Sequence, residues 1–150
     1  MKKKIYAGYI LAALAAGGLS ALLTKDGMAQ FAMLEQPPLS PPGWIFPVVW
    51  SVLYLLMGIS AAMVRLKGGR EKLWIFWGQL AVNFLWSIFF FGRQWYFFSF
   101  AWLVLLFVLV AGMILSFRKV SPKAAALQLP YLLWLAFAGY LNLGVALLNP

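Results

Sequence analysis

Five long runs of apolar residues, separated by short polar or basic connectors, fill almost the whole chain. None of the five runs contains Asp, Glu, Lys or Arg. A helix needs about 20 apolar residues to cross a bilayer core of ~30 Å, and each run is close to that length. The pattern predicts an all-α integral membrane bundle of five transmembrane helices, in one domain over residues 1–150. The predicted spans cover residues 5–23, 44–64, 73–91, 95–117 and 124–148.

The composition supports a membrane environment. Apolar residues make up 65% of the chain and its mean hydropathy is +0.89, whereas a soluble domain is closer to half apolar. The first run follows Lys2, Lys3 and Lys4 and therefore has a second interpretation, as a signal peptide. Its apolar stretch exceeds the usual core of a signal peptide, which favours a retained span. Small residues in this run, such as Ala12 and Ala16, predict close packing between helices.

Charge is sparse and one-sided, with 12 basic residues against 3 acidic ones. Ten of the basic residues fall on one side of the predicted membrane, and only Lys25 and Arg93 fall on the other. The positive-inside rule therefore predicts a cytoplasmic N-terminus and an external C-terminus. The basic residues lie between apolar runs and form no groove or arm. They indicate topology and do not predict nucleic-acid binding.

The connector over residues 24–43 is unusual in this economical chain. Loops of about 20 residues are uncommon and are usually functional or disordered. Proline fixes the backbone φ angle, and this connector contains Pro37, Pro38, Pro41 and Pro42. It also contains the apolar residues Phe31, Met33, Leu34 and Leu39. We expect a stiff apolar lid on the outer mouth of the bundle. Ser40 and Ser121, each followed by proline, look like helix N-caps.

Aromatic and polar side chains share faces of three predicted helices, because residues three and four apart are neighbours on a helix. These faces are Phe46, Trp50, Tyr54 and Met57; Gln79, Asn83, Trp86, Ser87 and Phe90; and Trp134, Ala138, Leu141 and Asn142. A rise of 1.5 Å per residue places Tyr54 and Asn83 near mid-membrane, roughly 15 Å from their span ends. They could anchor a ligand in an apolar pocket or bond only to neighbouring helices. Aromatic residues near span ends predict an interfacial belt: Trp44, Trp74, Trp77, Trp95 and Tyr96.

Several kinds of chemistry are excluded by absent residue types. The chain has no Cys and no His, so disulfides, zinc sites and catalysis by those residues are excluded. No predicted span contains a carboxylate, so no proton relay or ion-coupling site is visible. We predict no metal site and no obligatory cofactor. Any transport would be facilitated or driven by a partner.

Three motifs then resemble one family over essentially the whole chain. Pro41-Pro42-Gly43-Trp44, followed by residues 49–54, resembles the start of the second span of the translocator proteins, also called TspO/MBR, tryptophan-rich sensory proteins or peripheral-type benzodiazepine receptors. Residues 78–86 with Phe90-Phe91-Gly92 resemble the third span. Val120-Ser121-Pro122 with residues 130–138 resembles the fifth span.

This resemblance implies a five-helix bundle, often a homodimer, with a pocket open towards the first loop. It implies binding of porphyrins such as protoporphyrin or haem and, in animal members, of cholesterol and benzodiazepine-type drugs. The residues that match the family's pocket positions are Phe46, Trp50, Tyr54, Asn83, Phe90, Trp134, Ala138 and Leu141. Trp86, on the same face as Asn83 and Phe90, joins these predicted ligand-binding residues. Trp50 and Trp134 match tryptophans linked to light-dependent porphyrin breakdown in bacterial members.

The chain departs from the family at two places. Pro38-Leu39 stands where members usually carry an aromatic residue in the first loop. Around Leu141-Asn142-Leu143 the Tyr and the following basic residue of the cholesterol-recognition pattern are missing. Two hypotheses lead: a tetrapyrrole-binding protein with a sensory, regulatory or transport role, or an enzyme-like porphyrin degrader that uses Trp50 and Trp134. The basic N-terminus favours a bacterial cytoplasmic membrane, with an outer membrane as the alternative.

Overall fold

The structure, a computed structural model, describes residues 1–150 as helices joined by short connectors, without a β-strand. Four long uninterrupted α-helices account for most of the chain. Short helical segments lie in the long connector and in the basic turn, and others extend the third and fifth spans. In chain order the elements are α1 (Lys2–Leu23), α2 (Lys25–Phe31), α3 (Ile45–Leu66), η1 (Arg70–Lys72), α4 (Trp74–Ser87), the π-helix η2 (Ile88–Gly92), α5 (Tyr96–Arg118), α6 (Pro122–Leu127) and α7 (Leu129–Leu148).

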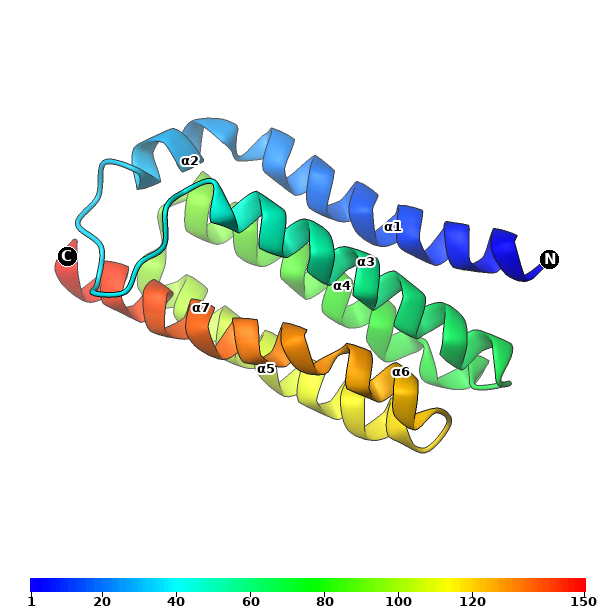
Figure 1. Ribbon diagram of the computed structural model, residues 1–150. Coiled ribbons are helices and arrows are strands. Elements are labelled where there is room, and N and C mark those ends of the chain that lie inside the picture. Colours follow the sequence, from blue (N-terminus) through cyan, green and yellow to red (C-terminus); the bar gives the residue numbers. More distant parts are fainter.

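Five helical segments are long and apolar enough to cross a bilayer, which confirms the predicted fold class. They are Lys2–Leu23, Ile45–Leu66, Arg70–Gly92, Tyr96–Arg118 and Pro122–Leu148. The chain is therefore a multi-pass integral membrane protein. The N-terminus and the turns after α3 and α5 lie at one end of the bundle, and the C-terminus, α2 and the long connector lie at the other (Figure 1). We call these the basic end and the lid end.

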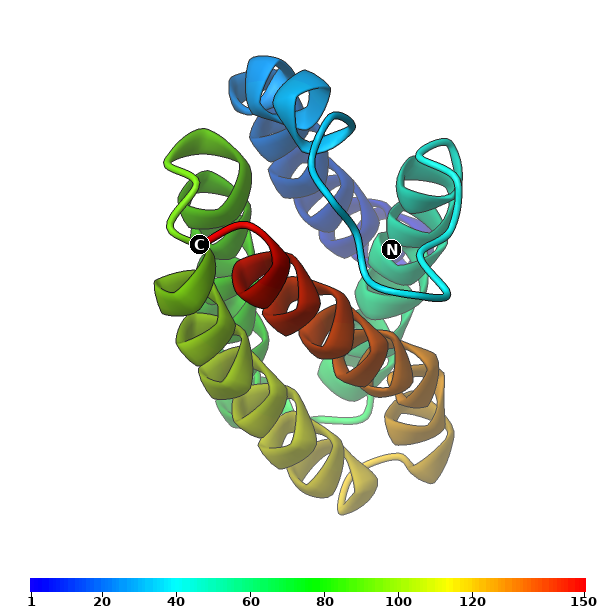
Figure 2. The same ribbon diagram turned by 90° about the vertical axis from the view of Figure 1, so that its left-hand side faces the viewer.

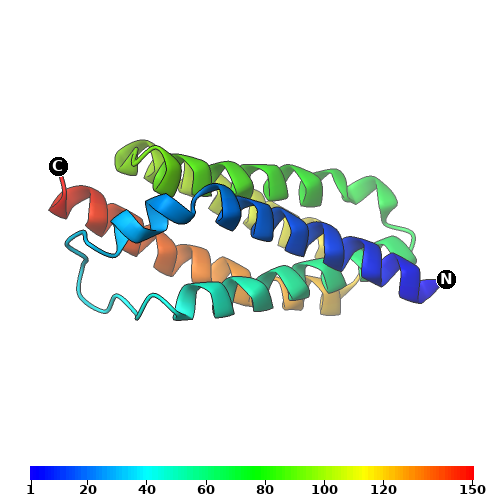
Figure 3. The ribbon, with the colours of Figure 1, turned by 90° about the horizontal axis from the view of Figure 1, so that it is seen from above.

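The long helices form a closed ring around one core. α1 packs between α3 and α4, α5 packs between α4 and α7, and α3 completes the ring through α6 (Figure 2). Seen from above, the helices run antiparallel along a common axis (Figure 3). The largest fully buried side chains include Met57, Phe76, Phe117 and Tyr131. Because α3 packs on α6 and hardly on α7, the bundle is filled towards the basic end and looser towards the lid end.

Two glycines set the contact between α1 and α3. A Cβ atom on Gly58 would lie 2.5 Å from the Cα atom of Ile10, so the two backbones touch there. A Cβ atom on Gly17 would overlap the ring of Tyr54. The small residues of the first span therefore serve close packing within the bundle, as predicted from the sequence.

Local structure differs from the sequence-based expectation at the long connector. Residues 25–31 form helix α2, where a loop was expected; Asp26 in its first turn suits the positive end of the helix dipole. Ser40 does not cap a helix: its hydroxyl donates to the carbonyl of Pro37 at 2.7 Å, and α3 begins at Ile45. Residues before proline avoid the helical region, so Ser40 and Pro41 stay outside the helix.

The fifth span differs too, because it is interrupted. Ser121 does cap α6, since its hydroxyl accepts from the backbone N–H of Ala124 at 3.2 Å, as predicted. The helix then breaks at Gln128 and resumes as α7. Pro130, in the first turn of α7, has no N–H to donate to the preceding turn, which accounts for the break.

Candidate ligand-binding cavity

The face of α3 that the sequence analysis selected borders a cavity at the lid end. Phe46, Trp50 and Tyr54 line this cavity, while Met57, one turn further along, is fully buried beneath it. Pro47 is tolerated because it stands in the first turn of α3, where backbone N–H groups have no partner inside the helix. The four-residue spacing of the three aromatic residues stacks them along the cavity wall.

A π-helix widens the second wall. Trp86 and Ser87 end α4, and η2 continues the span from Ile88 to Gly92. Phe90 and Phe91 both line the cavity although they are adjacent in sequence. The wider turn of a π-helix, which occurs often at functional sites, brings both rings to this side. Trp86 stacks on Phe90 with ring centroids 5.3 Å apart.

Helix α7 supplies the third wall with Trp134, Ala138, Leu141 and Asn142. The Asn142 side chain joins three elements: its Oδ1 accepts from the indole N–H of Trp86 at 3.0 Å, and its Nδ2 donates to the carbonyl of Tyr96 at 2.8 Å. The indole N–H of Trp134 is buried and has no partner in the protein.

The roof consists of α2 and the connector that follows it. Phe31 packs against Phe46, Phe90 and Phe91, with ring centroids 5.5 to 6.2 Å apart. Met33 and Leu39, also expected to pack, are instead 89% and 84% exposed. Gln36, Pro41, Pro42 and Gly43 complete the lining on this side. The expected apolar lid thus exists in part, as a short helix whose Met28 and Phe31 line the cavity.

The connector is fastened to the end of α7. Asn149 accepts from the backbone N–H of Glu35 at 3.2 Å and donates to the carbonyl of the same residue at 2.8 Å. The hydroxyl of Tyr140 donates to the carbonyl of Pro38 at 2.5 Å. Pro37 is buried against Gly144, where any side chain would overlap the proline ring. These contacts hold the roof against α7 and leave its other edge, towards α1, without such a clasp.

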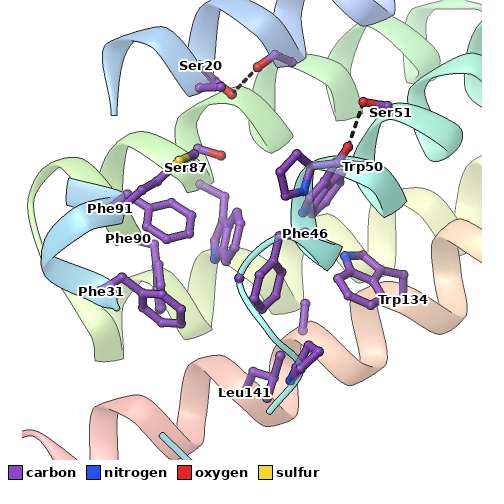
Figure 4. Close-up of a pocket in the computed structure, with 18 of the residues that line it drawn as sticks. Ser20, Phe31, Phe46, Trp50, Ser51, Ser87, Phe90, Phe91, Trp134 and Leu141 are labelled. Atoms are coloured by element: carbon purple, nitrogen blue, oxygen red, sulfur yellow. Dashed lines mark hydrogen bonds between the residues drawn. The ribbon is translucent and has the colours of Figure 1, made fainter. Parts of the chain in front are cut away.

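The cavity has a volume of about 590 Å³ and is drawn in Figure 4. Its lining contains no Asp, Glu, Lys or Arg. Trp50 stands at the centre of the aromatic wall, with its ring centroid 6.3 Å from that of Trp86 and 6.5 Å from that of Trp134. Such a cavity suits a large, flat, apolar ligand with few polar groups.

A chain of buried hydrogen bonds forms the floor. The hydroxyl of Tyr54 donates to Oδ1 of Asn83 at 2.9 Å, and Nδ2 of Asn83 donates to the hydroxyl of Tyr131 at 2.6 Å. The hydroxyl of Tyr131 donates to Oε1 of Gln79 at 2.7 Å, and the amide of Gln79 donates to the carbonyl of Phe76 at 3.0 Å. We call Tyr54, Asn83, Tyr131 and Gln79 the floor network. It ties α3, α4 and α7 together.

Eight of the nine predicted ligand-binding residues line the cavity; Asn83 does not. Asn83 lies behind Tyr54 and is only 1% exposed, and both polar atoms of its amide bond to tyrosines of neighbouring helices. The sequence left two roles open for Asn83, anchoring a ligand or hydrogen bonding between helices, and the structure supports hydrogen bonding between helices. Lys25 and Arg93, the two basic residues on the outer side of the predicted membrane, do not line the cavity either; the Arg93 guanidinium lies 5.8 Å from the Trp95 ring centroid.

Sequence reasoning missed several lining residues on the side of α1 and the roof. These are chiefly Gly17, Gly18, Met28, Pro41 and Phe91. The resemblance of the Pro41-Pro42-Gly43-Trp44 and Phe90-Phe91-Gly92 motifs was a signal for Pro41 and Phe91. Nothing in the local pattern of α1 distinguishes Gly17 and Gly18 from its other small residues.

The fold and the cavity together define a class: a small polytopic helical membrane protein with an aromatic-lined cavity between its helices. Comparison with known proteins identifies the family. A sequence model of the TspO/MBR family matches residues 9–148, and the chain belongs to this family. It is 38% identical to the translocator protein of Bos taurus over 146 residues, which cover 90% of this chain and 84% of that protein.

Microbial relatives match equally well. The tryptophan-rich protein TspO of Chlorobaculum tepidum is 36% identical over 136 residues, covering 87% of this chain and 86% of its own. The tryptophan-rich protein TspO of Archaeoglobus fulgidus is 39% identical over 147 residues, which cover 93% of this chain and 94% of that protein. The similarity thus extends across all five spans in bacterial, archaeal and animal proteins.

Proposed function

We propose that this protein binds tetrapyrroles, such as protoporphyrin or haem, in the cavity at the lid end and has a sensory, regulatory or transport role. The observation that carries the proposal is the uncharged cavity of about 590 Å³ walled by Phe46, Trp50, Trp86, Phe90 and Trp134. Flat aromatic ligands gain from stacked and edge-to-face contacts with such rings. Membership of a family with tryptophan-rich members supports the same assignment.

The polar groups of the ligand have restricted places. The indole N–H of Trp134 is buried and has no partner in the protein, and it would donate to an acceptor atom of the macrocycle only if the ring turned towards the cavity. Porphyrin carboxylates would not enter the cavity, because an unpaired buried charge is costly and the lining offers no cation. They would instead face the lid end, where Lys25 and Arg93 are exposed.

Fluorescence titration tests this function. Bound protoporphyrin would quench the emission of Trp50, Trp86 and Trp134, which line the cavity. We expect Trp134→Phe to weaken binding by about tenfold, equal to 1.4 kcal/mol, through the loss of part of the stacking surface. Trp74→Phe is the matched control, because Trp74 is 68% exposed and lies outside the cavity. The proposal fails if protoporphyrin leaves tryptophan emission unchanged.

A second function, light- and oxygen-dependent breakdown of porphyrin, has one specific observation in its favour. Trp50 and Trp134 both line the cavity and meet edge to face, at 89°, so two oxidisable rings would flank one ligand. Light would excite the porphyrin, and dioxygen would be the terminal oxidant. Illumination of the aerated complex tests this idea. If a Trp50→Phe, Trp134→Phe double variant bleaches porphyrin as fast as wild type, the tryptophans have no part in it.

We further propose a bacterial cytoplasmic membrane, with the basic end in the cytoplasm, and assembly with a second copy of the chain. The asymmetry of ten basic residues against two supports this orientation. A transport role is distinguished from binding alone by the flux of labelled porphyrin across liposomes, with and without an ion gradient. Sterols and benzodiazepine-type drugs belong in the same titration series as competitors.

A further inference from the structure

Some residues line the cavity and are also exposed on the outside of the bundle. On α1 these are Leu14, Gly18 and Ala21, and on α3 they are Pro47 and Ser51; on the roof they are Met28, Ala32, Pro42 and Gly43. A side chain that borders a cavity and is exposed as well marks the rim of an opening. The groups on α1 and α3 lie where these two helices face each other, so the cavity opens sideways between them, and the roof residues mark the end of this opening at the lid end. We call this opening the slot.

The packing of α1 on α3 shows where the slot begins. Pro47, Ser51, Tyr54 and Gly58 are spaced by 4, 3 and 4 residues, so they share the face of α3 that looks towards α1. Gly58 touches the backbone of Ile10, and Tyr54 lies on Gly17. One turn from Tyr54 towards the lid end, Ser51 of α3 is exposed. On α1, Gly18 directly follows Gly17, and a Cβ atom there would meet nothing within 4 Å. The two helices are therefore in contact up to Tyr54, and their ribbons diverge towards the lid end (Figure 1).

The slot lies within the depth of the membrane. With a rise of 1.5 Å per residue, Gly18 lies roughly 8 Å below the end of α1 at Leu23, and Ser51 roughly 10 Å below Trp44. Both positions fall inside a hydrocarbon core of about 30 Å. The rim residues carry no charge, and the hydroxyl of Ser51 is already bonded to the carbonyl of Pro47 at 2.7 Å. Lipid chains, and not water, are therefore the neighbours of the slot.

We propose that the slot is a lateral portal through which a membrane-dissolved ligand passes between the bilayer and the cavity. The proposal rests on the proposed function in one respect, because a ligand must occupy the cavity. It narrows the ligand class to flat, lipid-soluble molecules that insert edge first between α1 and α3. The roof can then stay fastened by Asn149 and Tyr140 while the ligand enters.

Site-directed labelling tests the position of the slot without any ligand. The chain has no cysteine, so Gly18→Cys and Ser51→Cys each provide a single site for a spin label. In liposomes, we expect lipid-soluble oxygen to relax both labels strongly and a water-soluble nickel chelate to have little effect. Lys67→Cys, on the exposed turn after α3, should show the opposite pattern. If the chelate reaches Gly18 and Ser51 better than oxygen does, or if neither quencher reaches them, the proposal is wrong.

Binding kinetics test passage through the slot. A phenylalanine at Gly18 would fill the slot, and its Cβ has free space. We expect Gly18→Phe to slow association of vesicle-dissolved protoporphyrin by about tenfold, whereas a loss of cavity contacts alone would act mainly on the rate of release. Gly8→Phe is the matched control, since Gly8 is also exposed, lies on α1, has free space around its Cβ and is remote from the cavity.

The spin-label and kinetic experiments together distinguish failure of the proposed function from failure of the lateral portal. If wild-type protein binds no protoporphyrin, the proposed function fails, and the spin labels alone decide whether the slot faces lipid. If wild type binds but Gly18→Phe associates as fast as Gly8→Phe, tetrapyrrole binding stands and the lateral portal is overturned.

Discussion

Replacing Asn83 with leucine tests whether this residue holds the helices together or holds the ligand. The substitution removes two hydrogen bonds, one from the hydroxyl of Tyr54 and one to the hydroxyl of Tyr131. Side-chain hydrogen bonds in membrane bundles contribute about 0.6 kcal/mol on average and up to about 1.7 kcal/mol. Because the site is only 1% exposed, no lipid or water replaces them. Asn83→Leu should therefore lower the free energy of unfolding by roughly 1 to 3 kcal/mol.

The assay combines reversible unfolding in detergent micelles with the protoporphyrin titration. Tyr54→Phe removes the Tyr54–Asn83 bond alone, and we expect the double variant to cost less than the sum of the two single changes by about 0.6 kcal/mol. Asn83→Leu should leave Kd for protoporphyrin within about threefold, less than 0.7 kcal/mol. If Asn83→Leu keeps wild-type stability but loses the ligand, the floor network is not structural and Asn83 is a ligand anchor.

Three further predictions concern local contacts. Gly58→Ala should destabilise the bundle by about 1 to 3 kcal/mol, because the added methyl group overpacks against backbone. Gly78→Ala should not, because a Cβ atom there meets nothing within 4 Å. Thermal unfolding of the two variants makes the comparison. Asn149→Ala removes both side-chain bonds to Glu35 and should speed hydrogen exchange in residues 32–43 while α1 exchanges unchanged. Ser121→Ala removes the cap of α6 and should lower the free energy of unfolding by about 1 kcal/mol. Ser121→Thr keeps the hydroxyl and should retain most of that stability. Equal free energies of unfolding for the two variants would contradict the capping role.

The spans could be predicted because each depends on local composition. Charge-free apolar runs of membrane length give the five helices without any knowledge of packing. The aromatic faces followed from helical periodicity, but spacing alone left Trp50, Trp86 and Trp134 open between a packing role and a pocket role, and the family resemblance supplied the pocket assignment of Trp50 and Trp134. The break in the last span was not predicted: the apolar run over residues 124–148 predicts one span, although Pro130 falls inside it.

The remaining features depend on partners distant in sequence. Spacing places Asn83 on the correct face of α4, but its amide donates to the hydroxyl of Tyr131, which lies 48 residues further along the chain. The π-helix brings Phe91 beside Phe90, and no glycine or proline within residues 86–91 announces it. Helix α2 was assigned to a loop because the prolines after it dominated the composition. Its packing on Phe91 through Phe31 is tertiary.

The cavity and the floor network together bear on the choice between binding and passage. The cavity ends at Tyr54, and beyond it the interior is closed by Asn83, Tyr131 and Gln79, all at most 1% exposed. A macrocycle that crossed the bundle would have to separate α3, α4 and α7 and break every bond of the floor network. A ligand that enters through the slot between α1 and α3 breaks none of these bonds. The structure therefore favours a protein that exchanges its ligand with one half of the bilayer over one that conducts it from face to face.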